Sequence, residues 1–244
     1  MDTQRQAKIS EAVSNFLTSD LIASVDPIVT QGKEVTVRSF LDMASTNLKD
    51  KFIDEPLVEA RIRQTLGWTY RNLGELDKAE SHLLRAWQIR RQHLGQEHLE
   101  TLDSMSQLSW LYWDQGRYDE MEQLWVETLK GRLRLFGEEH PVTLHNMNSL
   151  AFSYHHLGRY EDAELLYVKV IETCRRVLGE EHNVTVQTMA NLAPLYTALG
   201  RYDEAELLFD KALELERRLW GEEYPWRLNA MCSLANLYQA QGRY

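Results

Sequence analysis

Residues 192–202 read Leu-Ala-Pro-Leu-Tyr-Thr-Ala-Leu-Gly-Arg-Tyr, and this stretch decides the fold because the chain repeats it. The same pattern lies 42 residues earlier at 150–160, and further steps of 42 residues reach 108–118, 66–76 and, in the forward direction, 234–244. One glycine keeps this spacing in all copies, at Gly74, Gly116, Gly158, Gly200 and Gly242. Recurrence at a fixed period of about 20–50 residues is the signature of a repeat array, so the sequence predicts one.

The composition of the 244-residue chain is that of a folded protein and argues against several classes of partner. Apolar residues make up 43% and charged residues 26%, which is ordinary for a folded protein. The formal net charge of −10 disfavours nucleic acid and anionic membranes as main partners, since both require a basic surface. Cys174 and Cys232 are the only cysteines, so we expect two isolated thiols rather than a disulfide framework. No apolar run approaches the ~20 residues that span a bilayer, and we expect no membrane insertion.

Residues 1–55 precede the regular repeats and predict a pair of helices that acts as a degenerate repeat or cap. Apolar residues at helical spacing predict a helix over residues 3–24, and the proline and glycine of residues 25–35 predict a loop. A second helix is predicted to start near Thr36, a suitable N-cap, and its apolar stripe ends in register with the repeats at Phe52.

The array of residues 56–244 is predicted to consist of units of two helices. The units share the 42-residue register and cover 57–98, 99–140, 141–182 and 183–224, with a half unit at 225–244. Gly158 is expected to end the first helix of its unit, because glycine tolerates the positive φ of a helix end. A second glycine column, to which Gly179 belongs, is expected to end the second helix, and Pro141 suits the first position of the next one.

A column of small residues predicts that the two helices of each unit pack closely. The residue after the repeated leucine is small in every unit: Gly67, Ser109, Ala151, Ala193 and Ala235. A small residue also recurs early in the second helix, at Ala79, Ala163 and Ala205, with Met121 in the remaining unit. A large residue four positions later, such as Tyr167 or Phe209, is expected to fill the space beside the small residue.

These residues resemble the tetratricopeptide repeat family. The third unit shows the pattern of the family in order, with Leu150-Ala151, Tyr154, Gly158, Ala163 and Tyr167. The usual unit has about 34 residues, whereas units of 42 residues whose second helix leads into Arg-Arg-x-Leu-Gly-Glu-Glu-His are similar to the kinesin-light-chain type. The resemblance covers residues 56–244 and implies an all-α, right-handed superhelix that binds a protein or peptide.

The leader carries a second resemblance. Glu11-Ala12-Val13, Phe16-Leu17, Ala23-Ser24-Val25-Asp26-Pro27 and Val35-Thr36-Val37-Arg38 resemble the region after the kinase domain in some bacterial eukaryotic-like serine/threonine kinases. This resemblance implies a sensor or docking arm of a multidomain kinase. The chain itself has no Gly-rich loop, His-Arg-Asp or Asp-Phe-Gly motif, so the kinase domain would lie elsewhere in a longer protein. Because the N-terminus lacks the apolar core of a signal peptide, we expect a cytoplasmic location, or an extracytoplasmic one if the parent kinase spans a membrane.

The resemblance also implies a concave groove that is lined by the first helix of each unit. The lining positions lie −5, −2, +2, +5 and +6 from the repeated leucine. In the first unit they are Arg61, Gln64, Trp68, Arg71 and Asn72. In the second unit they are Asp103, Ser106, Trp110, Trp113 and Asp114. In the third unit they are His145, Asn148, Phe152, His155 and His156, and the fourth unit is blander.

Trp68, Trp110, Trp113 and Phe152 are the most informative of these positions, because they lie off the apolar stripe of their helices. Exposed aromatic residues are enriched in binding hot spots, which favours a peptide-binding role. The alternative is that these rings pack between repeats or against the leader.

The polar groove positions are mixed in character. Gln64 and Asn148 are expected to hold a peptide backbone through their donor and acceptor groups. Two arginines share the groove with two aspartates: Arg61, Arg71, Asp103 and Asp114. The groove therefore predicts no charge for its ligand.

Histidines invite a metal hypothesis, which their spacing disfavours. His145 is separated from His155 and His156 by ten and eleven residues, about three turns of one helix, which is too far for a shared ion. We therefore expect solvated groove residues, no bound metal and no cofactor. Another set recurs every 42 residues in the connectors and is expected to be structural: His98, His140 and His182. Catalytic motifs such as Gly-x-Ser-x-Gly and His-Glu-x-x-His are missing from the sequence, so we predict no enzymatic activity.

Residues 225–244 supply the first helix of a fifth unit without its partner. Leu234, Leu237 and Tyr238 are therefore expected to lack a covering helix, although arrays normally end in a polar cap. Either more repeats follow in a longer protein or another molecule covers this surface. We predict concentration-dependent self-association through it.

Overall fold

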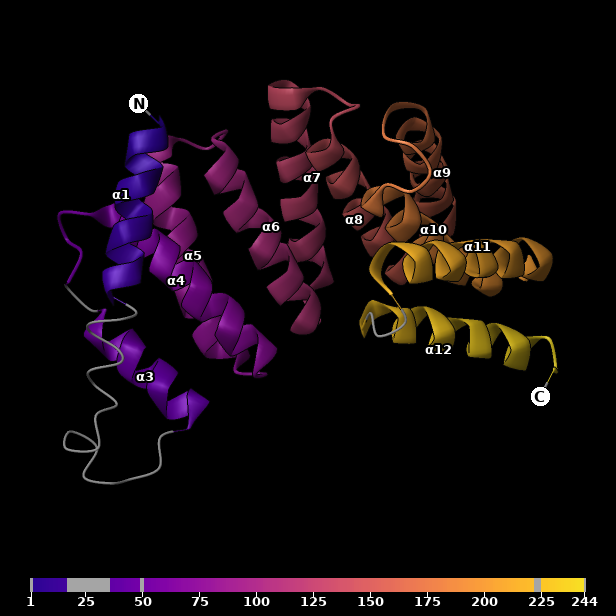
Figure 1. Ribbon diagram of the computed structural model, residues 1–244, viewed down its shortest axis with the longest axis horizontal. Helices are drawn as coiled ribbons and strands as arrows, with labels where there is room; N and C mark the ends of the chain where they lie inside the picture. The colour runs from indigo at the N-terminus through magenta and orange to yellow at the C-terminus, as the bar shows by residue number, and fades with distance from the viewer. Residues whose placement is uncertain (1, 17–35, 49–50, 222–224, 244) are drawn as a thin grey trace. The chain divides into compact units, whose positions relative to one another are not determined.

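The computed structural model describes residues 2–16, 36–48, 51–221 and 225–243, and the regular elements of these residues are all helices (Figure 1). The chain divides into two compact bodies, the N-terminal body of residues 1–124 and the C-terminal body of residues 125–244. The boundary falls inside one helix, α7. None of the described helices combines the length and the apolarity needed to cross a membrane.

The N-terminal body contains the leader and the first repeat and a half. Its helices are α1 (Asp2–Asn15), α3 (Val37–Asn47), α4 (Pro56–Asn72), α5 (Leu76–Leu94), α6 (Leu99–Asp114) and the first part of α7 (Tyr118–Phe136). α4 packs against α5, α6 lies against both, and α1 and α3 pack on α4. These contacts bury one continuous core that includes residues of the leader and of the first repeat.

The leader follows the prediction as far as it is described. The helix predicted over 3–24 is observed as α1, and the rest of that prediction and the predicted loop at 25–35 lie within residues 17–35, outside the described residues. The predicted N-cap is confirmed, because the Thr36 Oγ1 accepts a hydrogen bond from the backbone N–H of Ser39 at 3.1 Å. Phe16 and Phe52 meet edge to face with ring centroids 5.8 Å apart, which joins α1 to the end of the leader.

The C-terminal body continues the array. Its helices are the rest of α7, α8 (Pro141–His156), α9 (Tyr160–Val177), α10 (Asn183–Ala198), α11 (Tyr202–Trp220) and α12 (Pro225–Ala240). α8 pairs with α9 and α10 pairs with α11, while α10 also lies beside α8 and α12. Neighbouring first helices thus lie side by side, with the second helices packed against them.

The turns between helices are fixed by the predicted glycine and histidine columns. Gly158 has a φ of 76° and Gly221 a φ of 85°, which is the left-handed region that glycine enters most easily. The structural role expected for the connector histidines is confirmed, because each is an N-cap. The Nδ1 atom accepts from the backbone N–H two residues further on, at 3.2 Å for His98, 3.3 Å for His140 and 3.3 Å for His182.

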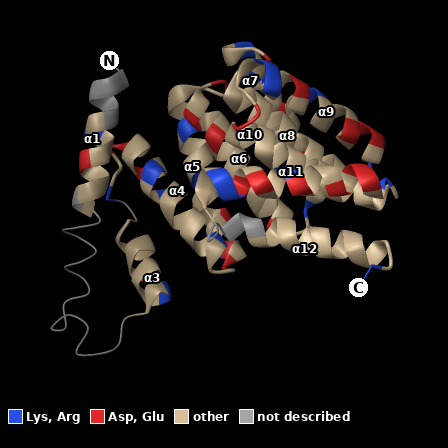
Figure 2. Ribbon diagram, turned by 45° about the vertical axis from the view of Figure 1, so that its right-hand side comes forward, with Lys and Arg blue, Asp and Glu red and all other residues tan. Residues whose placement is uncertain are grey.

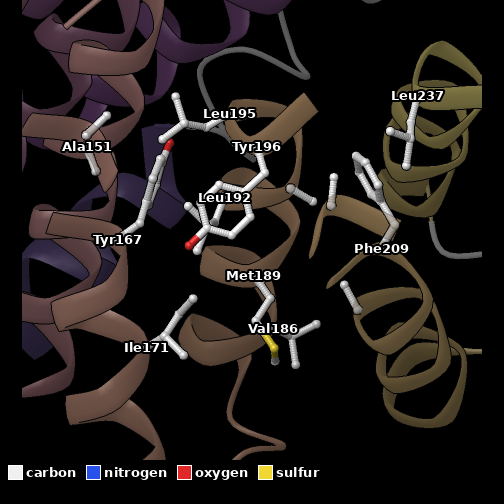
Figure 3. Packing of buried hydrophobic residues seen from close by; sticks show 14 of the residues in the cluster. Ala151, Tyr167, Ile171, Val186, Met189, Leu192, Leu195, Tyr196, Phe209 and Leu237 are labelled. Carbon is white, nitrogen blue, oxygen red and sulfur yellow. The ribbon is translucent and has the colours of Figure 1, made fainter. Parts of the chain in front are cut away.

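The small-residue column lets the paired helices approach closely, as predicted. A Cβ atom placed on Gly67 would lie only 2.6 Å from the Cγ atom of Leu83, so this position excludes any side chain. In the C-terminal body, Ala151 and Ala193 share one buried cluster with Tyr167 and Phe209. Figure 3 shows the ring of Phe209 lying between α10 and Leu237 of α12.

At three junctions, an arginine of the later repeat joins that repeat to the one before it. It lies over a tyrosine of its own repeat, at 4.0 Å for Arg117–Tyr112, 3.9 Å for Arg201–Tyr196 and 4.4 Å for Arg243–Tyr238. The same guanidinium pairs with a glutamate of the preceding second helix, at 2.7 Å for Glu80–Arg117, 2.5 Å for Glu164–Arg201 and 2.8 Å for Glu206–Arg243. Cation–π and ionic contacts thus combine at the junctions between repeats.

The leader repeats this ion pair with its charges exchanged. Arg38 of α3 pairs with Glu75 at 2.7 Å, and these positions precede Glu80 and Arg117 by one 42-residue step. α3 therefore holds the ion-pair position that a second helix holds in the array. That residues 1–55 as a whole act as a degenerate repeat or cap stays a prediction.

We expect Arg38→Glu to weaken the docking of α3, because it places two carboxylates together. The pair is partly exposed, so the loss in free energy of unfolding should be about 0.2–1 kcal/mol. Urea unfolding of Arg38→Glu, Glu75→Arg and the double variant tests this. The double variant should recover most of the loss, and strictly additive losses would show that the two side chains do not interact.

Candidate protein-binding face

The predicted groove residues lie on what we call the first-helix face. In the N-terminal body this face is formed by α4 and α6, and in the C-terminal body by α8 and α10, so each part is described separately. Gly67 and Ala151 turn towards the second helices of their repeats. The predicted positions lie on other sides of the same helices, because residues of an α-helix advance by about 100° each.

The N-terminal part of the face contains a neutral cluster of an aromatic ring and an ion pair. The side chain of Trp68 is 39% exposed, and the guanidinium of Arg71 lies over its ring at 4.7 Å. The Nε atom of Arg71 also donates to Asp114 Oδ2 at 2.5 Å. The cluster joins α4 to α6, so Trp68 is an exposed aromatic ring in contact with a paired arginine.

Gln64 is oriented by a buried arginine that sequence reasoning missed. Arg90 of α5 is buried, and its Nη2 atom donates to Gln64 Oε1 at 2.6 Å while its Nη1 atom donates to Ser104 Oγ at 2.7 Å. Glu100 lies 3.4 Å from the Nε atom of Arg90. Burial lowers the pKa of Arg90, and the neighbouring Glu100 opposes this shift. The oxygen of Gln64 is therefore engaged, and its amide N–H groups are the part that could donate to a ligand.

The two tryptophans of α6 are half-buried. Trp110 and Trp113 each keep part of their surface accessible, and the ring of Trp113 lies 5.3 Å from that of Tyr118. The two tryptophans are therefore partly packed within the protein and partly accessible to a partner, so each of the two alternatives considered for these rings applies in part. The remaining predicted residues of this part of the face are partly or largely exposed: Arg61, Asn72, Asp103 and Ser106.

In the C-terminal body, Asn148 joins first helices rather than facing open solvent. Its side chain is buried, and its Oδ1 atom accepts from Asn191 Nδ2 of α10 at 3.2 Å. His145 on the same helix is exposed. As with Gln64, the amide oxygen is used within the protein, which leaves the amide nitrogen as the donor.

Phe152, His155 and His156 form an aromatic cluster at the end of α8. His156 lies 4.3 Å from the Phe152 ring and 5.0 Å from the His155 ring, and His155 lies 5.9 Å from Tyr160, all between ring centroids. Burial, with a smaller effect of His156, lowers the pKa of His155 to about 4, and burial also lowers the pKa of His156. His145 and His156 are exposed, as expected for solvated groove residues, whereas His155 is half-buried.

No group of three or more His, Cys, Asp or Glu side chains suited to a metal ion occurs among the described residues.

Comparison with known proteins identifies the repeats. The tetratricopeptide repeat family matches residues 58–123, 111–173, 146–215 and 191–244. No curated protein matches the chain. Among solved structures, BtubC (BKLC) from P. vanneervenii is 23% identical with a TM-score of 0.69, and the match covers 86% of each chain. At this identity the likeness shows the fold alone.

Two further structures support the same fold. A protein from Podosopora anserina, described as a kinesin light chain with nearly identical TPR-like repeats, is 26% identical with a TM-score of 0.62 over 78% of this chain and 90% of its own. A tetratricopeptide repeat protein from Parabacteroides merdae is 19% identical with a TM-score of 0.58 over 96% of this chain and 75% of its own. The all-α fold of stacked helix pairs and the kinesin-light-chain type of repeat are thus both confirmed, and the chain belongs to the tetratricopeptide repeat family.

Proposed function

We propose that the chain is an interaction scaffold that binds a segment of a partner protein on its first-helix face. Tetratricopeptide repeats are protein-binding modules without catalytic function, and this family assignment supports the general role. The observation that carries the finer proposal is Trp68. It is an exposed tryptophan, fixed by a cation–π contact with Arg71, in a column that α6 continues with Trp110 one 42-residue step later.

The chemistry of the face favours an apolar partner segment over a charged one. Two of the four charged residues in its N-terminal part, Arg71 and Asp114, are already paired with each other. Its aromatic rings offer large contact areas at low cost in side-chain entropy. The amide N–H groups of Gln64 would donate to main-chain carbonyl groups of the partner, which would fix the direction of the bound segment.

Replacing both tryptophans of α6, as Trp110→Ala with Trp113→Ala, should weaken partner binding by at least about tenfold in Kd, because aromatic anchors dominate the energy of such interfaces. The measurement is selection of a peptide from a displayed random library with the wild-type chain, followed by titration of that peptide against both proteins. Circular dichroism must show that the double variant retains its helices, since both rings are half-buried.

The matched control replaces two exposed leucines on the outer sides of second helices, as Leu165→Ala with Leu207→Ala. These side chains are exposed and lie away from the first-helix face, so the Kd should stay within about twofold. A double tryptophan variant that is folded and binds as tightly as wild type would reject the proposed face.

The role as a docking arm of a kinase stays a prediction. Many of the leader residues that suggest it lie within 17–35, outside the described residues.

A further inference from the structure

The outer sides of α9 and α11 each carry a leucine that is exposed to solvent. Leu165 is 74% exposed and Leu207 is 70% exposed, and the two lie one 42-residue step apart. Each precedes a buried ring, Tyr167 or Phe209, by two residues, and two residues turn a helix by about 200°. The leucines therefore point away from the core, and we call Leu165 and Leu207 the outer leucines.

The outer leucines lie on neighbouring helices of one body. Arg201, at the start of α11, pairs with Glu164 of α9 at 2.5 Å. Lys211 of α11 pairs with Glu180, which follows α9, also at 2.5 Å. These ion pairs hold α11 beside α9, so the outer leucines belong to one continuous surface of the C-terminal body.

The repeat fold does not account for the outer leucines. A leucine this exposed adds little to stability, because apolar side chains stabilise a fold by leaving water. The same position holds Ser81 and Gln123 in the first two repeats, so a second helix does not need an apolar residue there. Exposed apolar side chains that share a surface mark interaction sites, which points to contact with another molecule.

Acidic side chains surround the outer leucines. Lys169 and Lys211 are each paired with a glutamate of the preceding connector, and Arg217 lies about three turns beyond Leu207. Exposed carboxylates lie one or two turns from the leucines on the same side, and within the described parts of the chain none of them forms an ion pair: Glu161, Glu172, Asp203, Asp210 and Glu214. Figure 2 shows the acidic segments along α9 and α11. The surface is therefore apolar at its centre and negative around it.

The charge of this surface selects the kind of partner. Pairing with the same surface of a second copy would bring negative charge against negative charge, which is costly at an interface. Nucleic acid and anionic lipid are negative as well. A basic segment of another protein is complementary, and an amphipathic helix can present basic side chains along both edges of one apolar stripe.

We propose that the outer sides of α9 and α11 bind a basic amphipathic helix of a partner protein. The apolar stripe of that helix covers Leu165 and Leu207, and its Lys or Arg side chains meet carboxylates such as Glu161 and Asp203. Burial of the leucines supplies affinity, and the charges orient the helix and speed its association. This surface is formed by second helices, so the interaction is separate from the proposed binding on the first-helix face.

The experiment uses a synthetic probe, a fluorescent helical peptide of about four turns with leucine on one side and lysine on the other. The probe is titrated with the full chain at about 0.15 M salt and followed by anisotropy. We expect saturable binding, and Leu165→Ser with Leu207→Gln should weaken it by at least about tenfold. These substitutions install the kinds of residue that the first two repeats carry at this position, so circular dichroism should show an intact fold.

A matched pair of variants separates this site from general attraction of a basic peptide to an acidic chain. Glu161→Gln with Asp203→Asn should weaken binding about fivefold. Asp77→Asn with Asp119→Asn removes the same charge from the same exposed position of the first two repeats, where the outer leucines are missing, and should leave the Kd within about twofold.

Three results would overturn the proposal. They are absence of saturable binding up to about 100 µM, unchanged binding by the leucine variant, and equal weakening by the two carboxylate variants. The Trp110→Ala/Trp113→Ala variant should bind the probe normally, so this proposal and the proposed function can fail independently. Loss of probe binding in that variant would place the probe on the first-helix face and would also overturn the proposal.

Discussion

Phe209→Ala is expected to destabilise the C-terminal body by about 3–5 kcal/mol, the usual cost of removing a buried phenylalanine ring. The Phe209 side chain is fully buried in a cluster that includes Ala193 and Leu237 (Figure 3). Its loss would open a cavity shared by α10, α11 and α12. Such a loss is a large part of the roughly 5–15 kcal/mol by which domains are stable.

The measurement is urea unfolding followed by circular dichroism, with Leu207→Ala as the control. Leu207 lies two residues away on the same helix and is exposed, so its replacement should change stability by no more than about 0.5 kcal/mol. Equal stability losses in the two variants would show that α11 does not turn the Phe209 side towards the core.

The second large effect is a loss of stability in mild acid that depends on His82. Burial, and then the charge of Arg63, lowers the pKa of His82 to about 4. Arg63 Nη1 lies 3.4 Å from His82 Nδ1, and a guanidinium can only donate. His82 Nδ1 is therefore the acceptor, and Nε2–H donates to Ser45 Oγ of α3 at 2.9 Å. Protonation would place an N–H group against Arg63.

The two pKa values of His82 decide whether its contribution to stability grows or shrinks as the pH falls. The folded pKa of about 4 lies below the unfolded value of about 6.5. The contribution of neutral His82 is therefore complete above about pH 6.5 and is lost as the pH falls towards 4. Between about pH 7.5 and about pH 4.5 it should fall by about 2 kcal/mol.

His82→Leu isolates this contribution from that of other acidic and basic groups. Leucine occupies the same position in the later repeats, as Leu124, Leu166 and Leu208, so the variant should fold. Urea unfolding of both proteins near pH 7.5 and near pH 4.5 should show a larger acid loss for wild type. An equal loss in both proteins would mean that His82 titrates normally.

The repeat architecture could be predicted because its signals are local or periodic. The glycine columns, Pro141 and Thr36 each act on the backbone at their own position, and the structure places them at helix ends. The small-residue column likewise predicts which side of a first helix meets the second, and Gly67 against Leu83 confirms it. Because the spacing is fixed at 42 residues, a signal found in one repeat predicts the same feature in the others.

The parts of the site that could not be predicted depend on contacts between repeats. The periodicity of the sequence predicts the position of a residue within its repeat. It does not predict which side chain of a neighbouring helix will contact that residue in the folded array. Asn148 and Gln64 were predicted as groove residues without Asn191 and Arg90, which engage their oxygens. One signal for Arg90 was available, since a charged residue interrupts the apolar stripe of α5 next to Ile89.

The most direct test of the central claim, that a partner chain lies on the first-helix face, is site-specific photocrosslinking. A benzophenone side chain would replace Arg61 of α4 in one variant and Gln88 of α5 in another, both exposed positions in the same repeat. With the selected peptide bound, crosslinks should form from position 61 and not from position 88. Crosslinks from position 88 alone, or equally from both, would contradict the claim.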